Sequence, residues 1–346
     1  MDLLTHAAAG ALLGEAFFRN RLGRAAPILG AVAAVVPDLD VVAGLFSSDP
    51  LVNLNVHRGA THSLLFVPLG AILVAVAATL VTRRRFPVVW CFLVALAGGA
   101  AHLVLDLATS YGTMILWPWD YTRWALDWFC FIDPYLLAIL AVTLILVWRR
   151  QRRDARPADD PRADGEIGEV HPGMPWRGIA LRGLVMALLY VLALGAGQRA
   201  AMDRLAEQLN HFGYTSDTVD RLSCTPVPFV PLAWNAFFTT DGGRRVHVGL
   251  IWILREGTTQ FDVMASDPPT PAVEAFRDSD AGRAWLRFAR YPVITTESGL
   301  NGVTNITGRD ERFQSWIPGL GRRRFPVAVI HADVTPDGAV KNVWME

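Results

Sequence analysis

The chain has 346 residues, of which 52% are hydrophobic and 18% are charged, and its basic and acidic side chains balance at 32 each. This composition departs from that of soluble proteins toward that of membrane proteins, and the zero net charge gives no sign of a nucleic-acid partner. A P-loop nucleotide site is excluded because the chain has no GxxxxGK[ST] motif. The three cysteines lie far apart, so neither a disulfide framework nor a CxxC metal site is predicted.

Two apolar stretches near the N-terminus predict helices. Residues 4–18 are rich in Ala and Leu and contain His6. Residues 28–46 are apolar apart from the two acids of Pro37-Asp38-Leu39-Asp40. The proline should break or kink the helix just before these acids.

A polar motif precedes the next apolar segment. The sequence His57-Arg58-Gly59-Ala60-Thr61-His62-Ser63 leads into residues 63–82, which carry no charge over twenty positions. About 20 apolar residues are needed to cross ~30 Å of hydrocarbon, so this segment predicts a span. Residues 87–108 predict another span, and His102 and Asp106 lie four positions apart on one face of it.

The remaining spans are separated by two polar segments. A tryptophan-rich loop, of the type that collects at membrane interfaces, leads to a predicted span at 132–148. The charged residues 149–177 predict a disordered linker before a last span at 179–197. Beyond it the sequence alternates as strands do, most clearly at 246–253 and 327–334.

The predicted fold is an α-helical multi-pass membrane domain of about five to six helices, followed by a C-terminal α+β, mainly β, soluble domain. The predicted parts are a membrane-embedded domain that carries the candidate site (1–148), a charged cytoplasmic linker (149–177), a transmembrane helix that continues into a polar helix (178–212) and an extracytoplasmic mainly β domain (213–346).

Arginine-rich loops predict the orientation in the membrane. Short loops rich in Arg tend to remain cytoplasmic, and such loops occur at 19–24, 83–85 and 149–156. With all three inside, the polar groups of the spans and the C-terminal domain come to the external face. These groups are His6, Asp38, Asp40, His57, His62, His102, Asp106 and Asp133.

Imidazole and carboxylate groups gathered at one membrane face predict a divalent metal site. The predicted ligands are His57, His62, His102 and Asp106, followed by His6, with Asp38 and Asp40 as further ligands or as the general base. This mixed donor set favours zinc, with manganese and iron as alternatives. Arg58 would hold a substrate anion through its planar fork, or would instead contact lipid phosphate.

Each group also has a structural explanation. His102 and Asp106 could form a buried pair on one helix, and the Asp38 and Asp40 carboxylates could cap a helix-ending turn. Thr61 and Ser63 could cap the helix that follows them, and Asp133 is expected first as a helix cap before Pro134. No chemistry is predicted for His211, His247 or His331.

Four blocks in the first ~150 residues resemble a known family. They are THaaaG (Thr5 to Gly10), PDLD (Pro37 to Asp40), HRGaTHS (His57 to Ser63) and HLvLDLaTSYGT (His102 to Thr113). In this order they resemble the membrane-bound metal-dependent hydrolase family of the YdjM/YbcI type. The resemblance implies a multi-pass protein of a bacterial or archaeal inner membrane, with a hydrolase site carried by His6, Asp38, Asp40, His57, His62, His102 and Asp106.

The HxxxD pattern of His102 and Asp106 is also similar, more weakly, to the zinc-dependent phospholipase C and nuclease superfamily, which implies phosphoester hydrolysis. The expected function is hydrolysis of a phosphoester or other lipid-linked substrate at the outer membrane surface, with membrane lipid as a partner and no nucleic acid. The alternatives are a non-catalytic, metal-stabilised envelope scaffold and a transporter. The transporter hypothesis is disfavoured because the ionisable groups cluster at one end of the spans.

Overall fold

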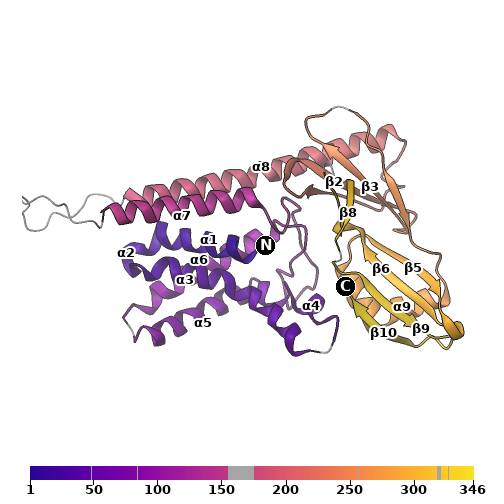
Figure 1. Ribbon diagram of the computed structural model, residues 1–346, viewed down its shortest axis with the longest axis horizontal. Helices are drawn as coiled ribbons and strands as arrows, with labels where there is room; N and C mark the ends of the chain where they lie inside the picture. Colours follow the sequence, from indigo (N-terminus) through magenta and orange to yellow (C-terminus); the bar gives the residue numbers. More distant parts are fainter. Residues whose placement is uncertain (48, 84, 155–174, 256, 318–320, 326) are drawn as a thin grey trace, which may run out of the picture.

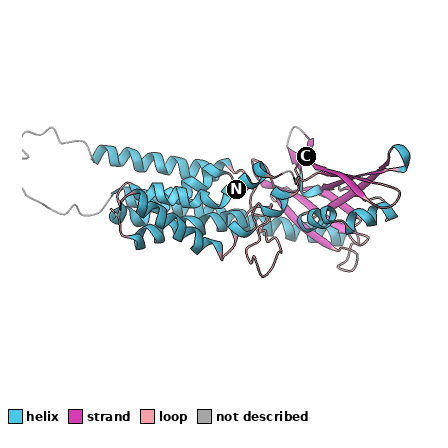
Figure 2. Cartoon of the chain, turned by 90° about the horizontal axis from the view of Figure 1, so that it is seen from below, coloured by secondary structure: helices cyan, strands magenta, loops and turns pink. Residues whose placement is uncertain are grey.

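The computed structural model describes residues 1–47, 49–83, 85–154, 175–255, 257–317, 321–325 and 327–346. A helical domain is followed by a C-terminal domain of antiparallel sheets, as the sequence predicts (Figure 1). Figure 2 shows most of the helices at one end of the molecule and the strands, with a few helices, at the other.

Eight α-helices and three short helical segments of other geometry form the helical part of the described chain. The α-helices are α1 (Leu3–Leu13), α2 (Arg19–Leu22), α3 (Ala25–Val35), α4 (Val52–Val56), α5 (Phe66–Val81), α6 (Val88–Leu107), α7 (Pro134–Asp154) and α8 (Pro175–His211). The other segments are the π-helix η1 (Gly14–Phe18) and the 3-10 helices η2 (Val36–Phe46) and η3 (Ala60–His62).

Four helical segments of the described chain are long and apolar enough to cross a membrane: Ala25–Gly44, Val88–Leu107, Pro134–Asp154 and Pro175–His211. A fifth candidate is a broken one, in which Leu54–His62 meets Phe66–Val81 at an angle of 74°. This bend follows the His57–Ser63 motif. The motif therefore ends at the junction between the short segment Leu54–His62 and helix α5.

Pro37 ends the regular helix as predicted. The α-helix α3 stops at Val35, and the chain continues as the tighter 3-10 helix η2, which carries Asp38 and Asp40. Proline lacks the N–H group that an α-helix interior needs, so the change of winding at this position follows from the sequence. A 3-10 helix has three residues per turn, so two residues two positions apart project in different directions.

Glycines let α1, α3 and α6 pack closely. A Cβ at Gly10 would overlap the carbonyl group of Gly30, and one at Gly98 would lie 2.6 Å from the same carbonyl oxygen. Small residues at helix contacts allow backbones to approach within a membrane, where packing rather than the hydrophobic effect holds helices together. This contact fixes the three helices whose ends carry His6, Asp38 and His102.

The two helices α7 and α8 join the domains. Asp133 caps α7, because its carboxylate accepts the backbone N–H groups of Tyr135 (3.0 Å) and Leu136 (2.9 Å). Helix α7 then runs to Asp154, so residues 149–154 are helical rather than part of the predicted linker. The predicted disorder at 155–174 lies outside the described residues.

Helix α8 belongs to both domains. Its 37 residues extend about 55 Å, which exceeds the ~30 Å of the hydrocarbon core. Figure 1 shows its first half beside α7 and its second half against strands β2 and β3. The buried side chains of Ala201, Leu205 and Leu209 pack there against Trp234 and Phe238.

Two four-stranded sheets and a hairpin build the C-terminal domain. The first sheet has the order β1-β2-β3-β4, the second β10-β9-β6-β5, and β7 pairs with β8, all antiparallel. The strands are β1 (Arg221–Val227), β2 (Val230–Thr240), β3 (Arg245–Trp252), β4 (Asp262–Ala265), β5 (Pro292–Ser298), β6 (Thr304–Asp310), β7 (Gln314–Ile317), β8 (Gly321–Arg324), β9 (Ile330–Val334) and β10 (Val340–Met345). Helices α9 (Pro271–Asp278) and α10 (Asp280–Phe288) pack on the second sheet. The short 3-10 helices η4 (Leu300–Gly302) and η5 (Glu311–Phe313) lie within its connections.

One predicted strand is shorter than its sequence pattern suggests. The alternation at 246–253 corresponds to β3, but the pattern at 327–334 becomes a strand only at Ile330. Ala328 has a φ of 57°, in the left-handed region that an extended strand cannot use. The chain therefore turns before β9 begins.

Candidate metal centre

Four helical segments bring the predicted ligands to one place. His6 lies on α1, Asp38 and Asp40 on η2, His62 on η3, and His102 and Asp106 on the last two turns of α6. His57 and Arg58 lie in the connection between α4 and η3. Residues up to 100 positions apart thus meet at the end of the helical domain that faces the C-terminal domain (Figure 1).

The inner group consists of Asp38, His62, His102 and Asp106. All four side chains are buried, and one ligand atom from each lies within 4.8 Å of the others. The His62 Nε2 atom is 3.2 Å from Asp38 Oδ1 and 3.2 Å from Asp106 Oδ2. The His102 Nε2 atom is 3.5 Å from Asp106 Oδ2 and 3.7 Å from Asp38 Oδ1. Two imidazoles and two carboxylates therefore converge on one point and could bind a metal ion.

The hydrogen bonds of His102 define its tautomer. Its Nδ1 atom lies 2.7 Å from the backbone carbonyl oxygen of Ala34, and a carbonyl can only accept, so Nδ1 carries the proton. In a neutral imidazole, Nε2 is then a lone-pair acceptor directed at the inner group. Within the described residues, neither His102 Nε2 nor Asp106 Oδ2 has a hydrogen-bond partner.

Two buried acceptors without a donor between them fit a cation. Orphaned polar atoms of this kind are rare and costly in folded proteins, and a divalent ion would satisfy both at once. A backbone carbonyl that orients a ligating imidazole through its second nitrogen is the usual support of such ligands. The donor set and its support therefore fit a metal.

Asp40 lies on the side of the His62 ring that faces away from the inner group. Its carboxylate lies 2.8 Å from His57 Nδ1 and 3.2 Å from His62 Nδ1, and it accepts the Thr61 hydroxyl (2.7 Å) and the Arg58 backbone N–H (3.1 Å). His62 Nδ1 also lies 2.9 Å from the Thr61 hydroxyl, and Nε2 shares a hydrogen bond with Asp38 Oδ1 (3.2 Å), so Nε2 would have to give up its proton to bind an ion. Asp40, His57 and His62 also form a second group that could hold an ion.

Arg58 is engaged with the protein itself. Its guanidinium lies 3.0 Å from Asp106 Oδ1, donates to the Thr109 hydroxyl (2.6 Å) and stands 4.7 Å above the centre of the Tyr111 ring. The residue has a φ of 55°, an uncommon conformation for a side chain other than glycine. Asp106 Oδ1 also contacts His6 Nε2 (3.2 Å) and the backbone ammonium group of Met1. One oxygen of Asp106 is thus surrounded by donors while the other faces the inner group.

The structure brings together all eight predicted site residues: His6, Asp38, Asp40, His57, Arg58, His62, His102 and Asp106. Asp38, predicted as a further ligand or as the general base, has its carboxylate among the potential ligand atoms. Asp133 instead caps α7 and accepts the Tyr190 hydroxyl at 2.9 Å. Ser63 caps the start of α5 through Phe66 N–H (3.1 Å), whereas Thr61 donates to Asp40.

Sequence reasoning missed several supporting groups. Thr109 and Tyr111 lie within the block His102–Thr113, so their place beside the histidines was a usable signal. The Ala34 carbonyl gives no such signal, because any residue supplies one. Nor does the sequence indicate that the C-terminal domain reaches the centre.

Aromatic and cationic side chains connect the C-terminal domain to the candidate metal centre. The Tyr111 ring packs edge-on against Phe288 (centroids 5.1 Å apart) and Phe313 (6.4 Å). Arg312 donates to the backbone carbonyl oxygens of Ser110 (3.0 Å) and Tyr111 (2.8 Å). Burial raises the pKa of the Tyr111 hydroxyl, so this ring is uncharged at neutral pH.

A second arginine, in the loop that follows α6, contacts the backbone around the start of the His57–Ser63 motif. Arg123 donates to the backbone carbonyl oxygens of Leu54 (2.7 Å), His57 (3.1 Å) and Gly112 (3.2 Å). Burial lowers the pKa of Arg123 to about 10, so the side chain stays cationic at neutral pH. The loop after α6 and the segment before η3 are thereby held together.

Comparison with known proteins agrees with the helical domain. The family model described as YdjM inner membrane protein matches residues 1–200. No curated protein and no solved structure matches the chain. The matched range contains every residue of the candidate metal centre.

Proposed function

Because the chain belongs to the YdjM family of inner membrane proteins, we propose that it is a membrane-bound metal-dependent hydrolase acting on a phosphoester or other lipid-linked substrate. One observation carries the proposal most directly. The unpartnered His102 Nε2 and Asp106 Oδ2 atoms converge with Asp38 and His62 in a buried group that could bind a metal ion.

Asp38, His62, His102 and Asp106 would hold the ion. Imidazole and carboxylate donors suit zinc, with manganese and iron as alternatives. When bound, the ion would supply Lewis-acid chemistry, which acidifies water and polarises a phosphoryl or carbonyl oxygen. Arg58 would balance the charge of Asp106 and keep its second oxygen directed at the ion.

His57 is the residue best suited to accept a proton. It is partly exposed, whereas the inner group is buried. A proton on its Nδ1 atom would be held by Asp40 at 2.8 Å, which leaves Nε2 as the basic nitrogen. The Asp40 carboxylate would stabilise the imidazolium that forms when Nε2 takes a proton from water.

Exposed apolar side chains beside the centre support a substrate that arrives from the membrane. Leu39, between the two aspartates, is 57% exposed, and Leu64, directly after the histidine motif, is 58% exposed. Apolar surface of this kind faces lipid more favourably than water. The arginine-rich ends of the spans, taken as cytoplasmic, would place the centre and the C-terminal domain at the external face.

The burial of the inner group favours a second candidate function. Closed sites with every ligand supplied by protein are typical of structural metals, whereas catalytic sites keep an open position. The centre could therefore stabilise a non-catalytic envelope scaffold. A hydrolase would lose turnover when a catalytic residue outside the inner group is replaced. A scaffold would show no turnover in any variant.

Hydrolysis by the metal-loaded, detergent-purified protein tests the proposal. We expect turnover of bis(p-nitrophenyl) phosphate or of a short-chain phosphatidylglycerol, lost with a chelator and restored by metal. His57→Ala should lower kcat by about 10²–10⁴-fold because a general base is removed, with unchanged metal content. His331→Ala, in the second sheet, is the matched control and should retain full activity. Absence of turnover of both substrates by metal-loaded protein would favour the scaffold.

A further inference from the structure

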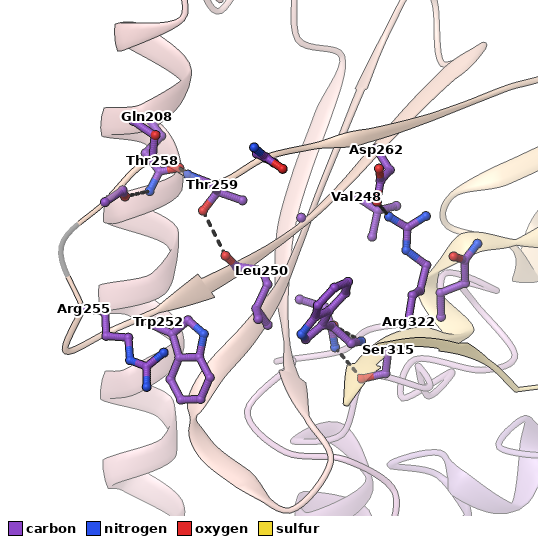
Figure 3. Close-up of a pocket in the computed structure, with 16 residues that line it drawn as sticks. Gln208, Val248, Leu250, Trp252, Arg255, Thr258, Thr259, Asp262, Ser315 and Arg322 are labelled. Carbon is purple, nitrogen blue, oxygen red and sulfur yellow. Dashed lines mark hydrogen bonds and ion pairs between the residues drawn. The ribbon is translucent and has the colours of Figure 1, made fainter. Parts of the chain in front are cut away.

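A cavity of about 570 Å³ lies in the C-terminal domain, between the second half of α8, strand β3 and the hairpin β7–β8 (Figure 3). This volume falls within the ~300–1,000 Å³ of small-molecule sites. None of the residues of the metal centre lines it. A ligand bound in this cavity would therefore not contact the candidate metal ligands.

The cavity wall offers two indole rings. Trp252 comes from β3 and Trp316 from β7, and Trp316 is 41% exposed. Figure 3 shows Trp252 beside Arg255, whose guanidinium lies 4.6 Å from the centre of the indole ring. Exposed indole faces provide flat, polarisable surfaces for stacking.

An amide without hydrogen-bond partners among the described residues lies between this cavity and a second hollow beside Phe313 and Arg324. Gln314 lines both, is only 3% exposed, and has a hydrogen-bond partner for neither Oε1 nor Nε2 within the described residues. Leaving such groups buried and unpaired is unfavourable, because each has lost its hydrogen bonds to water. A ligand that both donates and accepts hydrogen bonds would remove this cost.

The surrounding polar groups hold the cavity in shape. The Asn235 amide donates to the Ser315 hydroxyl (3.0 Å) and accepts the Trp316 backbone N–H (2.9 Å). On the opposite side, Gln208 Oε1 accepts the Thr259 backbone N–H (2.9 Å), while the Thr259 hydroxyl donates to the Leu250 carbonyl (2.9 Å; Figure 3). Because these contacts join protein groups to one another, the wall of the cavity needs little further ordering for binding.

The charges of the cavity select among ligand classes. Arg322 pairs with Asp262, so these two groups neutralise each other, and among the described residues of the wall Arg255 is the remaining charged side chain. A phosphate group would be expected to meet several convergent cations. An acyl chain would leave the Gln314 amide unpaired.

From these features we propose that the cavity binds a neutral saccharide. The apolar face of a pyranose ring stacks on Trp316, and ring hydroxyls donate to and accept from the Gln314 amide. Hydroxyl groups perform both roles, which matches an amide that presents one donor group and one acceptor. The C-terminal domain would thereby hold a glycan beside the membrane domain.

Isothermal titration of the full-length protein tests this proposal, with maltotriose and N,N′,N″-triacetylchitotriose as probes. The detergent must be non-glycosidic, because a maltoside head group is itself a saccharide. We expect saturable binding of at least one probe at or below ~10 mM. Trp316→Ala and, independently, Gln314→Leu should each weaken it by about tenfold or more.

The matched control is Trp344→Ala on β10, because Trp344 has a similar exposure of 48% but lies outside the cavity. It should keep the affinity within about twofold of the unmodified protein. The proposal is overturned if neither probe binds, or if Trp316→Ala and Gln314→Leu, folded by circular dichroism, bind as the control does. Binding of short-chain phosphatidylglycerol that Trp316→Ala abolishes, without saccharide binding, would assign the cavity to lipid.

Discussion

Replacing Asp40 with alanine is expected to weaken metal binding by about 10–100-fold and to destabilise the helical domain. Asp40 contacts His57, Arg58, Thr61 and His62 at 3.2 Å or less. Its removal releases the His62 ring and leaves buried donors unpaired. Removing one partner of a buried charged network costs about 3–5 kcal/mol. Metal titration and thermal unfolding of the purified protein measure the two effects.

Two further variants separate the effect of the lost Asp40 charge from the effect of replacing any aspartate. Asp40→Asn keeps the shape but not the charge, so it should lose metal affinity with a smaller loss of stability. Asp203→Ala removes an aspartate whose pairing with Arg199 is solvent-exposed, and such pairs contribute at most about 1 kcal/mol. If Asp40→Ala bound metal as tightly as Asp203→Ala, Asp40 would have no part in orienting His62.

Replacing Arg312 with methionine is expected to lower the melting temperature by roughly 5–10 °C. The guanidinium is buried, lies 2.9 Å from Asp310 and donates to the carbonyl oxygens of Ser110 and Tyr111. Methionine keeps much of the apolar packing but leaves the Asp310 carboxylate without its counter-charge, at a cost of about 3–5 kcal/mol. Tryptophan fluorescence during heating follows the transition.

Because Arg312 joins the two domains, its loss should also make the C-terminal domain easier to separate by limited proteolysis. Arg283→Ala is the matched control, since the pairing of Arg283 with Asp280 lies at the surface and should shift the transition by only about 1–2 °C. A melting temperature of Arg312→Met equal to that of Arg283→Ala would show that the interdomain contact contributes little.

That the site residues lie close together could be predicted from the sequence, because several strong local signals indicate the same arrangement of the helices. Uncharged spans, arginine-rich loops and the proline before Asp38 each follow from physical chemistry that acts over a few residues. Together they place His6, His62, His102 and Asp106 at the same end of their helices. The structure brings these residues into contact.

The different positions of Asp38 and Asp40 could not be predicted. In the sequence the two acids are equivalent, but the 3-10 winding of η2 turns Asp38 toward His62 Nε2 and Asp40 toward His62 Nδ1. The difference follows from the 3-10 winding of η2. Propensity and periodicity do not contain that information.

The contact between the C-terminal domain and the loop beside the candidate site could not be predicted either. Arg312 contacts Ser110 and Tyr111 across about two hundred positions of sequence, and one chain without an alignment gives no signal of such a contact. Tyr111 in turn lies beneath Arg58. We therefore expect that a variant in the C-terminal domain can disturb the candidate metal centre without replacing one of its ligands.

Metal content is the most direct test of the central claim that Asp38, His62, His102 and Asp106 hold a metal ion. Elemental analysis of detergent-purified protein should find about one equivalent of zinc, manganese or iron in the unmodified chain and in His211→Ala, whose exposed histidine lies at the end of α8. The double variant His102→Ala/Asp106→Ala should retain less than about a tenth of that amount. Equal metal in the double variant, or none in the unmodified protein after reloading, would contradict the account.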